Sequence, residues 1–382
     1  DLPFLMLVVL LTGIGVIMMF SASYAEALYE LENPTYYFMR QGLFAVAGLV
    51  IMYVVSKINY QTLRWLSVLA LMGSIFLLIL VKVPGIGDSA GGANRWIRAI
   101  GPLPRWQPSE AAKLGVILYF SARLSKRHTE KKRKFDLRKP SGRVLRFLDH
   151  IGFLELLPYG AILGVIALLL LWEPHLSATI LILAIGASIL FAAGIHLGWF
   201  ALGGGLMGAA LWVVANATSY MADRLAIWKN PWSDMQGDGY QIVQSLYAIG
   251  SGGLLGLGLG NSRQKFLYLP ELQNDYIFPI ICEELGFVGA AMVLVLFALL
   301  IIRGYWLALH ARDRFGALLA VGVTTQVAVQ VFLNIGVVTN LLPPTGISLP
   351  FFSYGGTALV IQLVEMGIVL GVSRQIPAPR AG

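Results

Sequence analysis

The sequence predicts an all-α integral membrane protein with about ten transmembrane helices. Of its 382 residues, 57% are hydrophobic and only 13% are charged, and the mean hydropathy is +0.73. A water-soluble globule of this size is less apolar. Long stretches also lack Asp, Glu, Lys and Arg, and a bilayer core about 30 Å thick needs roughly 20 apolar residues for each helix that crosses it.

These uncharged stretches give the expected positions of the helices. The two longest each hold two helices: the first divides near 193–196, and the second at Pro343-Pro344, which cannot continue a helix. A weaker segment at about 108–122 brings the total to ten, and we expect a single polytopic domain over 1–382. The uncharged stretches are 3–20, 41–56, 65–81, 156–172, 174–222, 285–302 and 315–364.

The distribution of Lys and Arg predicts the orientation. With both termini in the cytoplasm, eighteen of the 28 Lys and Arg residues fall in cytoplasmic segments, as the positive-inside rule requires. A basic loop at 123–150 carries much of the net charge of +8. We interpret this loop as a topogenic segment beside anionic lipid, so membrane lipids but no nucleic acid are expected as partners. The single cysteine, Cys282, excludes an intrachain disulfide and a cysteine-based metal cluster.

Polar residues retained in a membrane protein mark its chemistry, and here they gather in three loops outside the cytoplasm: 83–107, 216–284 and 337–357. The long loop 216–284 separates the seventh expected helix from the eighth. Its glycines between 252 and 260 match neither phosphate-binding fingerprint, because no Gly-Lys-Ser/Thr follows and no strand precedes them. We expect these glycines to serve close packing and tight turns.

Asp275 is the candidate catalytic residue of the long loop. It has aromatic and aliphatic neighbours and stands about one helical turn before an expected span. Partial desolvation there would suit a general base. The spacing also fits an N-terminal helix cap that accepts backbone N–H bonds, so the residues alone leave both readings open.

A second feature is a set of positive residues on the non-cytoplasmic side of the membrane, which usually carries few of them. If several converge, they could hold a phosphate or pyrophosphate through charge-assisted hydrogen bonds; otherwise they snorkel to lipid phosphates. Trp96 and Trp106 could serve as interfacial anchors. No His, Asp and Glu residues have the spacing of metal ligands, so no metal site is predicted. The positive set is Arg95, Arg98, Arg105, Arg224, Arg263 and Lys265.

Seven ordered motifs in these loops resemble the SEDS family, the polytopic proteins of bacterial shape, elongation, division and sporulation that include FtsW, RodA and SpoVE. The resemblance covers nearly the whole chain. The motifs are Gly92-Ala93-Asn94-Arg95-Trp96-Ile97, Gln107-Pro108-Ser109-Glu110, Gly239-Tyr240-Gln241, Gln264-Lys265-Phe266-Leu267-Tyr268-Leu269-Pro270-Glu271, Asp275-Tyr276-Ile277-Phe278, Glu283-Glu284-Leu285-Gly286 and Leu349-Pro350-Phe351-Phe352-Ser353-Tyr354-Gly355-Gly356.

The resemblance implies a glycosyltransferase that polymerises lipid II outside the bacterial cytoplasmic membrane, with a class B penicillin-binding protein as partner. It implies Asp275 as the essential aspartate. Residues 261–266 look most similar to the FtsW and SpoVE branch, which favours cell division or sporulation. No cofactor is assigned, although a divalent cation, Mg or Mn, could accompany pyrophosphate. The predicted substrate-binding residues are Arg95, Trp96, Arg224, Arg263, Lys265, Glu271 and Ser353.

Three positions depart from the family pattern. Asn274 stands where Thr commonly precedes the aspartate, and Trp106 stands where Phe is common. Glu173-Pro174-His175 replaces a frequent Gln-Pro-Asp, which puts in doubt any role of the acidic residue at position 175.

Two other functions compete with the glycosyltransferase. A lipid II flippase would line a polar path with charged residues along its spans, and few charged residues lie there. A non-catalytic scaffold of the division machinery would tolerate replacement of Asp275. The crowding of polar residues at one surface favours the enzyme.

Overall fold

The computed structural model describes residues 1–90, 93–99, 105–127, 146, 149, 152–217, 219–237, 239–266, 268–270 and 272–377. Most of the predicted basic loop at 123–150 therefore lies outside the described residues. The chain divides into two compact units. The first unit comprises residues 1–57, 206–306 and 327–370, and the second comprises 58–205, 307–326 and 371–382. The expected single domain over 1–382 stays a prediction.

The predicted all-α membrane architecture is confirmed. Within the described residues, seven helices are long and apolar enough to cross a membrane. Three more helices, α4, α7 and α8, occupy the remaining predicted positions and complete a set of ten. The seven are α1 (Leu2–Leu31), α2 (Tyr36–Lys57), α3 (Leu63–Leu80), α6 (Phe153–Trp172), α11 (Ile277–Leu309), α12 (Arg314–Val338) and α13 (Gly356–Ser373); the three are α4 (Pro108–Leu124), α7 (Leu176–Ala192) and α8 (Leu197–Ala217).

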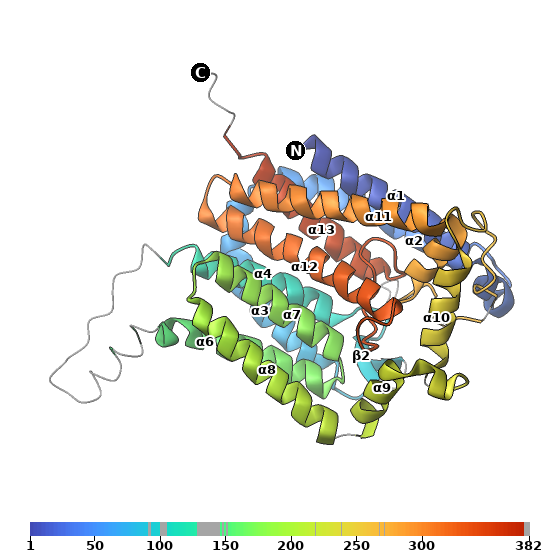
Figure 1. The fold of residues 1–382 in the computed structure, drawn as a ribbon. Coiled ribbons are helices and arrows are strands. Elements are labelled where there is room, and N and C mark those ends of the chain that lie inside the picture. Colours follow the sequence, from blue (N-terminus) through green and yellow to red (C-terminus); the bar gives the residue numbers. More distant parts are fainter. Residues whose placement is uncertain are drawn as a thin grey trace. The chain divides into compact units, whose positions relative to one another are not determined.

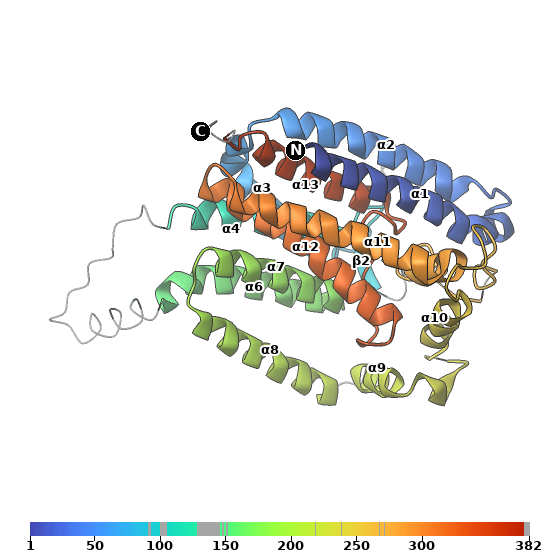
Figure 2. The ribbon, with the colours of Figure 1, turned by 45° about the horizontal axis from the view of Figure 1, so that its top comes forward.

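In the second unit, α4 packs against both α3 and α7, and α6 packs against α7, as Figure 2 shows. Gly115 permits the close contact of α4 with α3, because a Cβ there would lie 2.9 Å from Ser74 Oγ. This unit also contains a small element that the helical prediction missed. Strands β1 (Gly87–Ala90) and β2 (Ala93–Ile97) form an antiparallel hairpin, which an isolated bridge from Ile97 to Trp106 extends.

In the first unit, α1 lies beside α2 and α11 in both views (Figures 1 and 2). Helix α13 approaches α2 closely: a Cβ on Gly48 would lie 2.5 Å from Leu363, and one on Gly367 would lie 2.7 Å from the carbonyl oxygen of Met52. The long loop contains two helices of its own, α9 (Ser219–Lys229) and α10 (Tyr240–Ser251). Short 3-10 turns lie at Tyr60–Thr62 and Pro231–Asp234.

Helix α11 extends beyond the uncharged stretch at 285–302 and is broken. It begins at Ile277, soon after Asp275, and Gly286 interrupts it with φ 66° and ψ −169°. The break frees backbone groups that must find partners inside a membrane protein. The loop at 253–258 supplies them through four backbone hydrogen bonds of 2.9 to 3.1 Å to residues 283, 284, 287 and 288. The glycines between 252 and 260 thus serve close packing, as predicted.

The predicted break at Pro343-Pro344 is confirmed, and it lies within the predicted loop 337–357. Helix α12 ends at Val338, and α13 does not begin until Gly356. The intervening segment is irregular, with Gly346 at φ +66°. Hydrogen bonds to other parts of the fold hold this segment in place, and one of them comes from Asn334, which also bonds to Asp275.

Candidate functional site

Asp275 lies at the junction of the long loop, α11 and the segment between α12 and α13, all in the first unit. The side-chain amide of Asn334 donates to the Asp275 carbonyl oxygen at 2.8 Å and to the Ile347 carbonyl oxygen at 2.6 Å. The Asp275 carboxylate faces Gly346, since a Cβ built on Gly346 would lie 3.0 Å from its Oδ2 atom. Because α11 begins at Ile277, Tyr276 rather than Asp275 directly precedes the helix.

Arg224 brings positive charge to the same region. Its Nη1 atom donates to the Pro344 carbonyl oxygen at 2.8 Å. Burial raises the pKa of Tyr276, the adjacent Asp275 carboxylate raises it further, and Arg224 opposes both effects. The electrostatic influence of Arg224 therefore reaches the segment that carries Asp275. A carboxylate can accept a proton, and a guanidinium held in the same region can balance the charge of a negative leaving group.

Two further hydrogen bonds fix α9, the helix that carries Arg224. Trp228 Nε1 donates to the Asn340 carbonyl oxygen, and Asn340 Nδ2 donates back to the Trp228 carbonyl oxygen, both at 3.2 Å. Together with the bond from Arg224 to Pro344, this exchange ties α9 to the irregular segment after α12. The position of Arg224 is thus determined by contacts about 110 to 120 residues away in sequence.

The predicted substrate residue Lys265 lies in a buried ion pair. Its Nζ atom is 3.5 Å from Glu284 Oε1, and the two side chains are only 4% and 0% exposed. It also donates to the carbonyl oxygen of Gly260. Glu284 accepts further hydrogen bonds from the Ser21 hydroxyl at 2.7 Å and from the Ser262 backbone N–H at 3.2 Å. In this structure the ammonium of Lys265 anchors the loop to α11 and α1.

Glu283 completes this anchor. Its carboxylate accepts from the Ser262 hydroxyl at 2.5 Å and from the backbone N–H groups of Arg263 and Gln264 at 3.1 and 3.4 Å. A carboxylate that accepts from successive backbone N–H groups fixes a turn. The Arg263 side chain itself is exposed, so of the two cationic residues in this turn it is the one that points to the surface.

Ser353, another predicted substrate residue, takes part in a turn. Its hydroxyl accepts from the Leu349 backbone N–H at 2.7 Å, and its carbonyl oxygen accepts from Gln41 Nε2 at 3.1 Å. Gln41 also accepts from the Gly355 N–H at 3.4 Å. Ser353 therefore helps to attach the segment before α13 to α2. Glu271 lies outside the described residues.

Arg95 and Trp96 belong to strand β2 of the second unit. Arg95 donates to the carbonyl oxygens of Pro174 at 2.5 Å and Glu173 at 3.4 Å. The Glu173 carboxyl group is buried and has no hydrogen-bond partner within the described residues, and burial raises its pKa to about 8 against the opposing charges of Lys82 and Arg95. Burial likewise lowers the pKa of His175 to about 3, with help from Arg95 and Lys113.

The sequence analysis missed a buried ion pair in the same unit. Lys113 Nζ lies 2.8 Å from Glu110 Oε2, and the lysine is almost fully buried in α4. Gln107, at the start of the same motif, lies 3.4 Å from His175 Nε2. The i, i+3 spacing of Glu110 and Lys113 was the available signal, because such residues are neighbours on a helix.

A protein-built cation site does not fit the residues that the structure describes. Among them, no three His, Cys, Asp or Glu residues converge, whereas a divalent cation takes several oxygen ligands. We therefore derive no chemical step from a metal ion.

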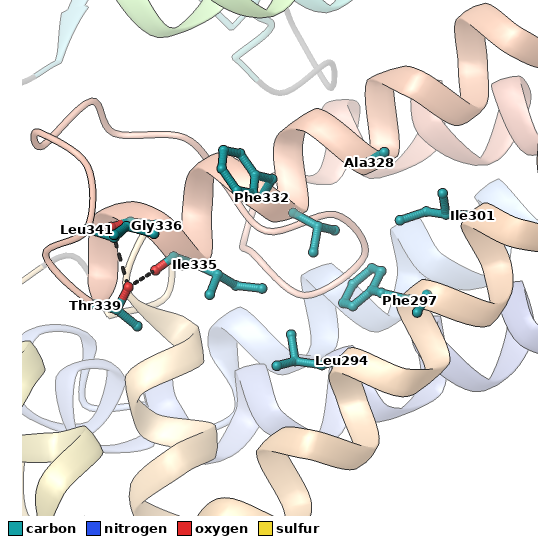
Figure 3. Close-up of a pocket in the computed structure, with 11 residues that line it drawn as sticks. Leu294, Phe297, Ile301, Ala328, Phe332, Ile335, Gly336, Thr339 and Leu341 are labelled. Carbon is teal, nitrogen blue, oxygen red and sulfur yellow. Dashed lines mark hydrogen bonds between the residues drawn. The ribbon is translucent and has the colours of Figure 1, made fainter.

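An apolar groove of about 300 Å³ lies between α11 and α12 in the first unit. Figure 3 shows Phe297 and Phe332 on opposite helices, with Thr339 and Leu341 at one end. Its lining includes three small residues, Ala298, Ala328 and Gly336, which allow another helix to approach closely. The Thr339 hydroxyl is turned back onto the Ile335 carbonyl oxygen at 2.7 Å, so the groove offers little polar contact.

Comparison with known proteins places these features in context. The family model described as "Cell cycle protein", covering FtsW, RodA and SpoVE, matches residues 2–377. A Geobacter sulfurreducens relative, "Probable peptidoglycan glycosyltransferase FtsW", is 38% identical over 376 residues, which are 98% of this chain and 95% of the relative. The Bacillus subtilis relative "Stage V sporulation protein E" is 40% identical over 375 residues, covering 98% of this chain and 97% of the relative.

Two solved structures have a similar fold. One is described as "Structural coordination of polymerization and crosslinking by a peptidoglycan synthase complex", with a TM-score of 0.74 at 27% identity, covering 98% of this chain and 97% of the other. The other is the rod shape determining protein RodA of Thermus thermophilus, with a TM-score of 0.68 at 26% identity and coverage of 99% and 98%.

Proposed function

Because the chain belongs to the FtsW, RodA and SpoVE family, with a match over residues 2–377, we propose that it is a peptidoglycan glycosyltransferase. It polymerises lipid II into glycan strands, for cell division or sporulation. Full-length relatives named as FtsW and as a stage V sporulation protein support this assignment. The chain is a multi-pass membrane protein. In the proposed orientation both termini lie in the cytoplasm, and the site then lies at the outer face of the bacterial cytoplasmic membrane.

The observation that carries the proposal is the placement of the Asp275 carboxylate against Gly346, with Arg224 hydrogen-bonded to Pro344 in the same segment as Gly346. Asp275 removes the proton from the 4-hydroxyl of the GlcNAc of one lipid II. The resulting oxygen attacks C1 of the MurNAc of a second lipid-linked chain, and undecaprenyl pyrophosphate leaves. A single carboxylate base acting opposite the leaving group predicts inversion at that carbon.

The pyrophosphate leaving group needs positive charge. Arg224 supports this role because its guanidinium is half-buried and oriented by Pro344, and Arg263 supports it because its side chain is exposed. We keep Arg95, Trp96, Glu271 and Ser353 as proposed substrate residues. Lys265 also stays in the proposed set, although its ion pair with Glu284 gives it a structural role as well.

A class B penicillin-binding protein is the proposed partner. One structural relative is part of a peptidoglycan synthase complex. The groove between α11 and α12 has the chemistry to receive the apolar membrane helix of such a partner, because small residues line it and Phe297 and Phe332 border it. A polyprenyl tail is the competing occupant, and a substitution in the groove distinguishes the two.

The direct test is polymerisation of lipid II by the purified chain, alone and with a class B penicillin-binding protein. The parent protein should give glycan polymer on a gel. Asp275→Asn should fold but lose activity by about 10²-fold or more, the usual contribution of a general base. Asp234→Asn, which alters an exposed aspartate of the same loop, is the matched control and should stay active.

The outcomes separate the competing functions. Polymer from the parent and the control but not from Asp275→Asn supports the glycosyltransferase. Near-normal polymerisation by Asp275→Asn would reject Asp275 as the base. Absence of polymer from every variant, even with the partner present, would favour the flippase or the scaffold.

A further inference from the structure

We propose that Asn334 is a positioning residue for Asp275, and this inference rests on the proposed function. Its one side-chain amide group holds two separate chain segments, the one that carries Asp275 and the one that carries Gly346. It acts through the backbone and does not touch the reacting atoms.

The geometry uses both donors of the amide. Asn334 Nδ2 carries two N–H groups, and it lies 2.8 Å from the Asp275 carbonyl oxygen and 2.6 Å from the Ile347 carbonyl oxygen. The Asn334 side chain is only 1% exposed. A buried aliphatic side chain or an ionised carboxylate in this position would remove this donor from both carbonyl oxygens.

The two carbonyl groups belong to the two segments that meet at the Asp275 carboxylate. One belongs to Asp275 itself, and the other belongs to Ile347, directly after the glycine that the carboxylate faces. Asn334 sits in regular helix α12, so it provides a rigid support for two irregular segments. A catalytic group displaced by about 1 Å can lose about 10²-fold in rate.

Three variants test this role by comparing kcat, KM and the pH dependence of kcat. In Asn334→Leu we expect kcat to fall about 10- to 100-fold with KM for lipid II changed less than about 3-fold, because binding contacts remain while the base is misplaced. Gln330→Leu is the matched control, since it removes a buried amide one helical turn away on the same face of α12 and should keep the parent kcat.

Asn334→Asp adds a readout that a purely structural role would not change. An ionised carboxylate next to the Asp275 backbone disfavours a second negative charge, so the acidic limb of the pH–rate profile should move up by about one pH unit. Asn334→Leu should leave that limb in place. The charged and titratable groups that couple to this segment include Tyr276 and Arg224, and both are unchanged in these variants.

Hydrogen–deuterium exchange in detergent provides a measurement that does not need activity. Backbone amides at 272–278 and 345–349 should exchange about ten times faster in Asn334→Leu than in the parent or in Gln330→Leu. If the parent makes no polymer, the proposed function fails while exchange still shows whether Asn334 ties the two segments. Parent-like exchange and parent-like kcat in both Asn334 variants would overturn the inference.

Discussion

The ammonium of Lys265 lies 3.5 Å from the carboxylate of Glu284, with both side chains buried. Removing one partner of a buried ion pair leaves an uncompensated charge and typically costs about 3–5 kcal/mol. We therefore expect Lys265→Met to lower the melting temperature in detergent strongly. The double variant Lys265→Met/Glu284→Gln should recover most of the loss, because no charge is then left unpaired.

Activity separates this anchoring role from pyrophosphate binding. If Lys265 only anchors the loop, the double variant should regain polymerisation together with stability. If it contacts pyrophosphate, the double variant should be stable but inactive. Arg263→Met is the matched control: its exposed side chain should change stability by no more than about 0.5 kcal/mol, so any loss of activity there reports on substrate.

Gly346 should tolerate no side chain beside Asp275. Its φ of +66° is strained for other residues, and a Cβ would lie 3.0 Å from Asp275 Oδ2. We expect Gly346→Ala to lower kcat about 10-fold or more by moving the carboxylate. Gly260→Ala pays a similar conformational cost at φ +83° but meets no atom within 4 Å. Equal polymerisation rates for the two variants would contradict the proposed position of the carboxylate.

The sequence predicted the spans well because absence of charge over about 20 residues is a local property. The uncharged stretch at 285–302 does not reach the start of α11 at Ile277, because the first part of the helix contains two charged residues that the fold buries, Glu283 and Glu284. Their burial depends on Ser21 and Ser262, and the bond from Ser21 to Glu284 joins residues 263 positions apart.

The candidate site was predictable only in part, because it also depends on contacts between residues far apart in the sequence. Asp275 stood out through its apolar neighbours and its motif. Asn334 did not, because its two bonds reach 59 and 13 residues along the chain to groups that every residue possesses, backbone carbonyls. Lys265 looked like a surface cation, since no sequence pattern shows that a lysine will meet a buried glutamate.

Glu173 should make stability depend on pH. Its pKa is raised from 4.5 to about 8, so the folded state keeps a proton that the unfolded state releases, and stability falls as pH rises between these values. His175, with its pKa lowered from 6.5 to about 3, acts in the opposite direction but only below about pH 6.5. Between pH 6.5 and 8, therefore, only Glu173 of these two residues changes the stability with pH.

The test is thermal unfolding in detergent across that pH interval. The parent should lose at most about 1.4 kcal/mol of stability per pH unit from this group, and Glu173→Gln should remove that slope. Glutamine is the residue that the family pattern frequently has at this position, so the substitution should be accommodated. Glu30→Gln, which alters an exposed carboxylate, should keep the parent slope; a Glu173→Gln slope equal to that of the parent would contradict the effect of burial.

The groove between α11 and α12 gives a last prediction. Ala328→Trp should fill it, because Ala328 lines its wall opposite Ala298 and Ile301. We expect copurification with a class B penicillin-binding protein to fall at least about 10-fold. The tryptophan would occupy the space that the partner's helix needs, and helix association in membranes depends on close van der Waals packing. Polymerisation by the isolated chain should change little.

Val295→Trp is the matched control, because Val295 is an exposed residue of α11 that does not line the groove. It should copurify like the parent. If Ala328→Trp instead keeps its partner and raises the KM for lipid II, the groove holds the polyprenyl tail of the substrate. That result would place the lipid beside Thr339 and Leu341. These residues line the end of the groove where the segment containing Gly346, which faces Asp275, begins.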